Sequence, residues 1–197
     1  MNDRQIDAPA YQLVYDGWLD KYFTGTAGGL TVLELGCGWG RDTSFLSGTG
    51  HTVVACDIDG DKIEMIKEKY PGVITSKFDM REIFPFGTAT ADIVIASLCI
   101  LFFNEAETLG ILAEIRRVLK NGGKFLCRLI SEKGRKPDVP GEAELSPGLF
   151  MTSGGLKQFY NEDRIRSVFK GWNIRSIMEY EMASDSWRMP VLEVVMD

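Results

Sequence analysis

Residues 31–42 read Thr-Val-Leu-Glu-Leu-Gly-Cys-Gly-Trp-Gly-Arg-Asp, and the rest of the chain is organised around this stretch. Apolar positions lead into Glu34, three glycines follow at alternate positions, and a polar run comes next. The pattern predicts a buried strand, a tight turn and the start of a helix, because glycine adopts positive φ without strain. The free N–H groups at a helix start favour a polar, nucleotide-like ligand. A glycine turn that binds nothing is the alternative for this stretch taken alone.

A second predicted strand ends on Asp57, which lies 21 residues after Gly36. An acidic residue about 20 positions after a glycine turn is placed to accept hydrogen bonds from ribose hydroxyls. Coupled to the turn, this interpretation of Asp57 is favoured over a helix cap, and Asp59 is expected to cap the following helix instead. With a nucleotide bound at Asp57, Ile58 would lie against the adenine ring.

Hydrophobic periodicity predicts strands and helices in alternation along most of the chain. Helices are expected at 10–23, 41–46, 61–70 and 109–119 and after Asn161, and strands at 31–35, 52–57, 73–77, 91–101, 124–130, 172–182 and 190–196. The sequence Asn121-Gly122-Gly123 is expected to end the 109–119 helix with a left-handed cap. This order predicts an α/β fold with a doubly wound parallel sheet, whose ligand site lies at the carboxyl ends of the strands.

The segment 131–160 departs from this alternation, because it holds five glycines and three prolines and has no clear period. A long irregular connection inside a compact domain is uncommon and tends to be functional. We expect it to form a loop or lid over the substrate. The whole chain, at 197 residues, has a length that suits a single domain over 1–197.

The spacing Gly-x-Gly-x-Gly after Glu34 resembles motif I of the class I S-adenosylmethionine (SAM) methyltransferases, and differs from the Gly-x-Gly-x-x-Gly dinucleotide fingerprint. Asp57, Asp79 and Asp92 follow at intervals similar to those of that family. The resemblance implies a Rossmann-like sheet of seven strands, mostly parallel with an antiparallel C-terminal hairpin, and helices on both faces. Within the family, the glycine turn and the stretch Leu-Lys-Gln-Phe-Tyr at 156–160 are similar to tellurite-resistance-type and thiopurine-type enzymes.

The resemblance also implies a cofactor, SAM, and the residues that hold it. These are Glu34, Gly36, Cys37, Gly38, Gly40, Asp57, Ile58, Asp79, Met80 and Ser97. Asp79 would accept from the adenine amino group, and Ser97 would lie beside the sulfonium. An N-terminal helical cap over 1–29 would cover core or close the cofactor site, which makes Tyr15 a residue of interest.

Composition limits the partners. The net charge of −6 argues against a nucleic-acid partner, which needs a basic face. The four cysteines are far apart and the one histidine, His51, precedes a strand, so we expect reduced core thiols and no metal site. No stretch reaches the length of a membrane span, and the N-terminus lacks a signal-peptide core, so we expect a cytoplasmic protein without a membrane partner. The chain is expected to be a monomer or a homodimer.

The predicted function is transfer of the sulfonium methyl group of SAM to N, O or S of a small-molecule acceptor by in-line displacement. Basic residues in or near 131–160, among them Arg128 and Lys157, favour an anionic acceptor, although solvated surface lysines explain most of them equally well. No catalytic base is identified, because His51 lies at the wrong end of its strand. Two alternatives stay open: a SAM-binding regulatory protein without turnover, and a nucleotide-dependent oxidoreductase that binds NAD.

Overall fold

The computed structural model describes residues 14–135, 139–183 and 188–197. Its strands are β1 (Thr31–Leu35), β2 (Thr52–Asp57), β3 (Ile74–Lys77), β4 (Ala91–Ser97), β5 (Leu119–Ile130), β6 (Ala143–Ser146), β7 (Leu149–Thr152), β8 (Gly155–Gln158), β9 (Ile174–Ala183) and β10 (Arg188–Met196). The helices are α1 (Asp20–Phe23), α2 (Arg41–Leu46), α3 (Gly60–Lys69), α4 (Glu105–Val118) and α5 (Glu162–Val168), with short 3-10 turns η2 (Ile100–Phe102) and η3 (Glu132–Gly134).

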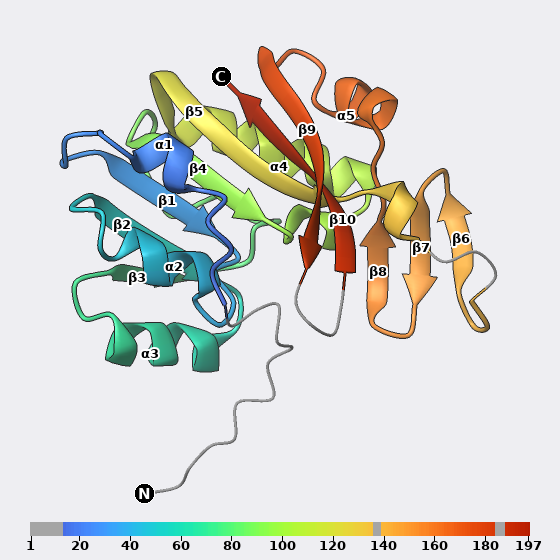
Figure 1. Ribbon diagram of the computed structural model, residues 1–197, viewed down its shortest axis with the longest axis horizontal. Helices are drawn as coiled ribbons and strands as arrows, with labels where there is room; N and C mark the ends of the chain where they lie inside the picture. Colours follow the sequence, from blue (N-terminus) through green and yellow to red (C-terminus); the bar gives the residue numbers. More distant parts are fainter. Residues whose placement is uncertain (1–13, 136–138, 184–187) are drawn as a thin grey trace, which may run out of the picture.

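Seven strands form one sheet in the order β3-β2-β1-β4-β5-β10-β9 (Figure 1). The strands β1 to β5 run parallel, whereas β10 is antiparallel to both β5 and β9. The order reverses between β1 and β4, which leaves a crevice at the carboxyl ends of these strands where ligands bind in open α/β sheets. The predicted fold class, including the C-terminal hairpin, is therefore confirmed.

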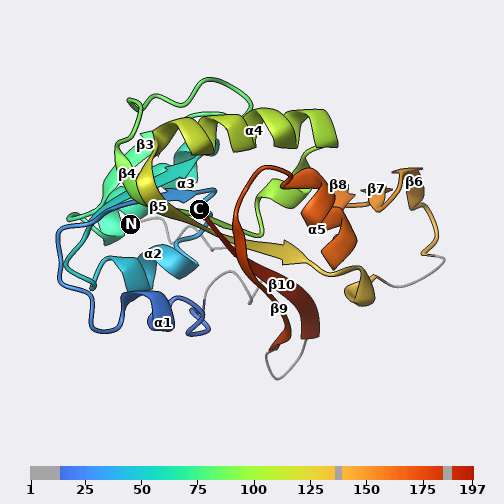
Figure 2. The same cartoon turned by 90° about the horizontal axis from the view of Figure 1, so that it is seen from above.

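Successive residues of the central strands point to opposite faces of the sheet, and both faces are covered. Val94 and Ala96 of β4 pack in one hydrophobic cluster with α4 and α5, while Ile93 and Ile95 pack in the other with α2 and α3. Figure 2 shows α4 on one side of the sheet and α1 and α2 on the other. Burial on both faces explains why β4 reads as a continuous apolar run.

Local signals fix where the main helices begin. Asn104 accepts from the amide of Glu107 (3.0 Å) while the Glu107 carboxylate accepts from the amide of Asn104 (2.9 Å), a capping box that starts α4. Asp59 caps α3 through the amide of Asp61 (3.0 Å), and Asn161 caps α5 through the amide of Arg164 (2.8 Å). The predictions for Asp59 and Asn161 are confirmed.

Two helix predictions were wrong in part. Of the predicted 10–23 helix, residues 10–13 lie outside the described residues. In the described part only Asp20–Phe23 is helical, because Gly17, with φ of 81°, is not in a helical conformation. The Asn121-Gly122-Gly123 sequence does not cap the 109–119 helix. That helix ends at Val118 because Leu119 is already extended and pairs with Ala91. Gly122, with its positive φ, lies inside β5 where the pairing with β4 shifts register.

The segment 131–160, expected to be irregular, contains a second sheet of three antiparallel strands in the order β6-β7-β8. Its strands have four residues each, too short to show a period. Gly148 (φ 72°) lies in the turn before β7, and Gly155 (φ 91°) is the first residue of β8 after the next turn. Strand β8 packs against η2, so the small sheet lies beside the carboxyl end of β4 (Figure 1).

Candidate functional site

The glycine turn leaves the end of β1 in a conformation that side chains resist. Gly36 has φ of 64°, and a Cβ on it would lie 2.6 Å from the Cβ of Cys99. Gly40, with φ of 80°, is the residue before α2, and its Cβ would lie 2.4 Å from the Ile66 side chain. The positive φ favours glycine at both positions, and at Gly36 the approach of the Cys99 Cβ, just after β4, also leaves no room for a side chain.

Asp57 holds the turn from the neighbouring strand. One carboxylate oxygen accepts from the amide of Gly38 (2.8 Å), and the other accepts from the amide of Asp59 (3.0 Å). A carboxylate oxygen can accept more than one hydrogen bond, so Asp57 retains acceptor capacity toward the cavity that it lines. This orientation follows from the register that places β1 and β2 side by side.

Glu34 is buried at the floor of the turn, where Thr43 donates a hydrogen bond to its carboxylate (2.7 Å). Burial, with a further contribution from the negative charge of Asp42, raises the pKa of Glu34 from 4.5 to about 8. The folded protein therefore keeps a proton on Glu34 at neutral pH that the unfolded chain loses.

We expect Glu34→Gln to gain stability over the natural protein as pH rises. Between pH 4.5 and 8 the folded state of the natural protein binds the extra proton, so its free energy of unfolding falls with pH, whereas glutamine does not titrate. The advantage of the variant should grow by about 3 kcal/mol between pH 4.5 and 7. Urea unfolding of both proteins at several pH values measures this, and a constant difference between them would show that Glu34 titrates normally.

A charged network surrounds Ser97 at the end of β4. The Ser97 hydroxyl oxygen accepts from Arg41 Nη2 (2.8 Å) and from Arg128 Nε (2.9 Å). Arg128 is fully buried, stacks on the Trp18 ring with 4.3 Å from its Cζ to the ring centroid, and pairs with Asp16 at 2.6 Å. Burial opposes its charge, but the carboxylates of Asp42 and Asp16 outweigh burial and raise the pKa of Arg128.

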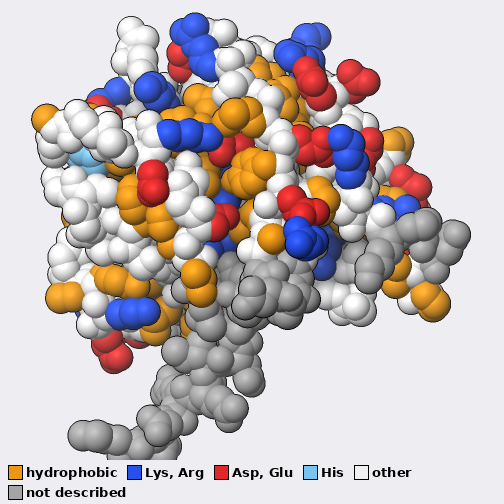
Figure 3. Space-filling view, viewed as in Figure 1, with side chains coloured by type: hydrophobic (Ala, Val, Ile, Leu, Met, Phe, Trp, Pro, Cys, Tyr) orange, Lys and Arg blue, Asp and Glu red, His pale blue; other side chains and the backbone are white. Residues whose placement is uncertain are grey.

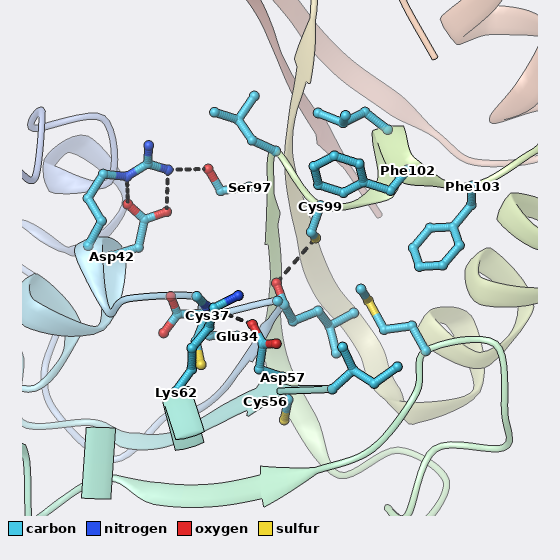
Figure 4. Close-up of a pocket in the computed structure, with 18 of the residues that line it drawn as sticks. Glu34, Cys37, Asp42, Cys56, Asp57, Lys62, Ser97, Cys99, Phe102 and Phe103 are labelled. Atoms are coloured by element: carbon cyan, nitrogen blue, oxygen red, sulfur yellow. Dashed lines mark hydrogen bonds and ion pairs between the residues drawn. The ribbon is translucent and has the colours of Figure 1, made fainter. Parts of the chain in front are cut away.

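These elements surround one cavity of about 510 Å³ at the carboxyl ends of β1, β2 and β4 (Figure 4). Its volume lies within the range of roughly 300–1,000 Å³ typical of small-molecule sites. The lining residues contributed by the predicted set are Glu34, Gly36, Cys37, Gly38, Asp57, Ile58, Asp79, Met80 and Ser97. Gly40 of that set does not line the cavity. Their contact with a cofactor stays a prediction, but the fold brings all except Gly40 to one place.

Asp79 and Ser97 of the predicted set also have arginine partners within the protein. The Arg81 side chain donates to both carboxylate oxygens of Asp79 and lowers the pKa of Asp79. Ser97 already accepts two hydrogen bonds, so toward the cavity its hydroxyl is best placed to donate. An adenine amino group at Asp79 would have to share the carboxylate with Arg81.

Other residues of interest lie away from the cavity. Tyr15 does not line it; its hydroxyl accepts from the amide of Leu19 (2.8 Å) and donates to Asp20 (2.8 Å). Asp92 accepts from the amide of Thr31 (2.8 Å) and from Lys120 (2.8 Å). These contacts lie at the amino ends of β1 and β4, whereas the cavity lies at their carboxyl ends. Asp92 therefore joins strands, and does not reach the site.

Sequence reasoning missed several lining residues. Arg41, Asp42 and Lys62 follow the glycine turn and β2 closely, but helix N-termini are commonly polar and carry no distinguishing signal. The apolar lining residues Phe102, Phe103, Ile130 and Met189 come from three separate segments. Within 14–135, 139–183 and 188–197, no group of three or more His, Cys, Asp or Glu side chains could hold a metal ion.

The four cysteines are free and buried, and burial raises the pKa of each thiol. Cys99 lines the cavity, where its thiol donates to the carbonyl of Leu35 (3.3 Å). Thiols held neutral in this way are poor nucleophiles. In the part of the chain that the structure describes, no helix is long and apolar enough to cross a membrane.

Comparisons with known proteins agree with this geometry. Residues 33–127 match the family model described as a methyltransferase domain. An uncharacterised methyltransferase of Synechocystis is 34% identical over 97 residues, covering 49% of this chain and 45% of the relative. A probable 18S rRNA (guanine-N(7))-methyltransferase of Dictyostelium discoideum is 26% identical over 155 residues, covering 73% of this chain and 53% of the relative. The chain spans about half the length of these curated relatives.

Solved structures share the fold. A SAM-dependent methyltransferase from Methanosarcina mazei superposes with a TM-score of 0.77 at 15% identity, over 93% of this chain and 98% of that one. A TehB-like SAM-dependent methyltransferase from Corynebacterium glutamicum superposes with a TM-score of 0.63 at 19% identity, over 88% and 82%. Residues 33–127 thus carry a methyltransferase domain, and the sheet around it has the fold of these SAM-dependent methyltransferases.

Proposed function

We propose that the protein transfers the methyl group of SAM to a nitrogen, oxygen or sulfur atom of a small-molecule acceptor. The observation that carries this proposal is that one cavity joins two different environments. One part holds the carboxyl groups of Glu34 and Asp57, and the other is lined by apolar and aromatic side chains. A cofactor and an acceptor would thus meet within one space.

The residues present fit SAM. The Asp57 carboxylate has free acceptor capacity for ribose hydroxyls, and Ile58, with 56% of its surface exposed, offers an apolar surface for adenine. Gly38 faces open space, since a Cβ there would meet nothing within 4 Å. The Glu34 carboxyl lies where a cationic ligand would favour its ionised form.

When bound, SAM supplies a methyl group that is already activated by the sulfonium. The protein's part is then to align the acceptor and to exclude water. Leu98 and Phe103 would exclude water from the reacting end, and the Ser97 hydroxyl, fixed by Arg41 and Arg128, would donate a hydrogen bond into it. His51 accepts a hydrogen bond from the amide of Leu30 (3.4 Å) and does not line the cavity, so we assign it no proton transfer.

The Dictyostelium relative is named for rRNA, which makes RNA the competing acceptor. The net charge of this chain is −6, and Figure 3 shows acidic and basic side chains intermingled with apolar ones over the face in view. RNA binding depends on a concentrated basic surface. These observations support a small molecule over RNA.

The test is an assay for S-adenosylhomocysteine (SAH) by mass spectrometry. The protein and SAM are incubated with a panel of small aromatic acids, amines and thiols, or with total RNA, and heat-inactivated protein serves as the control. We expect SAH to accumulate with at least one small molecule and not with RNA. Turnover with RNA alone would favour the activity named for the relative. Tight binding of SAM without turnover would favour a regulatory SAM-binding protein.

A further inference from the structure

The acceptor end of the cavity is assembled from segments that the sequence keeps apart. Phe102 lies in η2 after β4, Ile130 ends β5, Lys157 is in β8, and Met189 is in β10. Strand β8 packs against η2, and Lys157 of β8 and Phe102 of η2 both line the cavity. The small sheet β6-β7-β8 therefore contributes directly to the site, as a wall that carries a cation.

This end of the cavity offers an aromatic surface. Phe102 keeps 49% of its surface exposed although it is a large apolar residue, and Phe103 lines the cavity beside it. Figure 4 shows both rings on one side of the site, away from the grouped side chains of Glu34, Asp57 and Lys62. Exposed rings at a cavity wall favour flat partners, because aromatic rings stack on one another in offset or edge-to-face arrangements.

Lys157 is a cation of the lining that has no carboxylate partner among the described residues. Three cations of the lining are paired: Arg41 with Asp42 (3.0 Å), Arg81 with Asp79 (2.5 Å) and Lys62 with Asp59 (3.5 Å). Among the residues that the structure describes, Lys157 has no carboxylate within 4.0 Å. A half-buried lysine at the cavity wall favours an anion, because a charge-assisted hydrogen bond is stronger than a neutral one.

We propose that this end of the cavity binds a planar aromatic compound carrying an anionic group, with its ring against Phe102 and its anion at Lys157. The proposal rests on the proposed function, because it assigns the class of acceptor for the same site. It makes Lys157 and Phe102 the residues that determine acceptor specificity.

The probe is 1-naphthoate, compared with the neutral 1-naphthamide of the same shape, each titrated by calorimetry into the protein saturated with SAH. We expect naphthoate to bind, and to bind roughly 10-fold more tightly than naphthamide. Lys157→Met should remove that preference by weakening naphthoate alone, and Lys157→Arg should keep it. Phe102→Ala should weaken both compounds, by about fivefold.

Lys170→Met is the matched control, since it removes one exposed positive charge outside the cavity lining. It should leave both affinities unchanged. Equal affinities of naphthoate and naphthamide, a Lys157→Met protein that still prefers naphthoate, or no binding of either compound would overturn the proposal. SAH is titrated first in every variant. Failure to bind SAH would count against the proposed function, while normal SAH binding without a naphthoate preference counts against the acceptor class alone.

Discussion

Replacing Arg128 with methionine is expected to lower the free energy of unfolding by about 3–5 kcal/mol. Arg128 is fully buried, and its guanidinium pairs with Asp16 (2.6 Å) and Asp42 (3.6 Å) and donates to Ser97 (2.9 Å). Methionine fills much of the same volume but leaves Asp42, itself only 3% exposed, with a single cationic neighbour in Arg41. A buried carboxylate without full compensation is costly, which gives the large effect.

The measurement is urea unfolding followed by circular dichroism, with Arg188→Met as the matched control. Arg188 pairs with Glu181 at 2.7 Å, but its side chain is 72% exposed, so its loss should not change stability measurably. Arg128→Met and Arg188→Met thus remove the same group from a buried and an exposed ion pair. If both variants unfolded at the same urea concentration as the natural protein, the buried network would contribute no net stability.

The Arg128 network also shows where prediction from sequence reached its limit. Its members, Asp16, Asp42, Ser97 and Arg128, are contributed by four segments spread over more than a hundred residues. Ser97 was predicted only because the strand before it was recognisable. No periodicity or spacing indicates that two arginines converge on one hydroxyl, since that contact depends on the order of strands in the sheet.

The glycine turn was predictable for the opposite reason, because its constraints are local. Gly36, Gly38 and Gly40, which adopt positive φ, lie close together in the sequence. Asp57 follows at a characteristic distance, because one helix and one strand connect it to the turn. Even there, local sequence did not separate roles. Gly40 faces Ile66 of α3 and serves packing, although its spacing is identical to that of Gly36 and Gly38.

The short strands β6, β7 and β8 were missed because four residues cannot establish a period. The glycines and prolines of that segment predict an irregular loop, whereas Gly148 lies in the turn before β7 and Gly155 begins β8. In the sequence, Lys157 is one of several basic residues in or near 131–160, and a solvated surface position explains most of them equally well. Only the packing of β8 on η2 distinguishes it, because that contact brings Lys157 to the cavity.

Replacing Asp57 with alanine is expected to weaken the binding of SAH roughly 100-fold. Hydrogen bonds from ribose hydroxyls to a carboxylate are charge-assisted, and losing them costs about 2.7 kcal/mol, which is a factor of 100 in the dissociation constant. The variant also loses the acceptors for the amides of Gly38 (2.8 Å) and Asp59 (3.0 Å), so the turn is held less firmly. Asp57→Asn keeps one acceptor oxygen and should weaken binding by about tenfold.

Calorimetry with SAM, SAH and NAD measures these affinities, and Asp59→Ala is the matched control. Asp59 is an acidic residue two positions later that caps α3 and does not line the cavity, so its loss costs stability without removing a cofactor contact. If Asp59→Ala weakened SAH as much as Asp57→Ala, the effect would come from loosening α3. Binding of NAD in place of SAM and SAH would contradict the assignment of this cavity to SAM. A selective loss in Asp57→Ala would instead identify its carboxylate as the contact to the ribose, because only that variant removes an acceptor from the cavity wall.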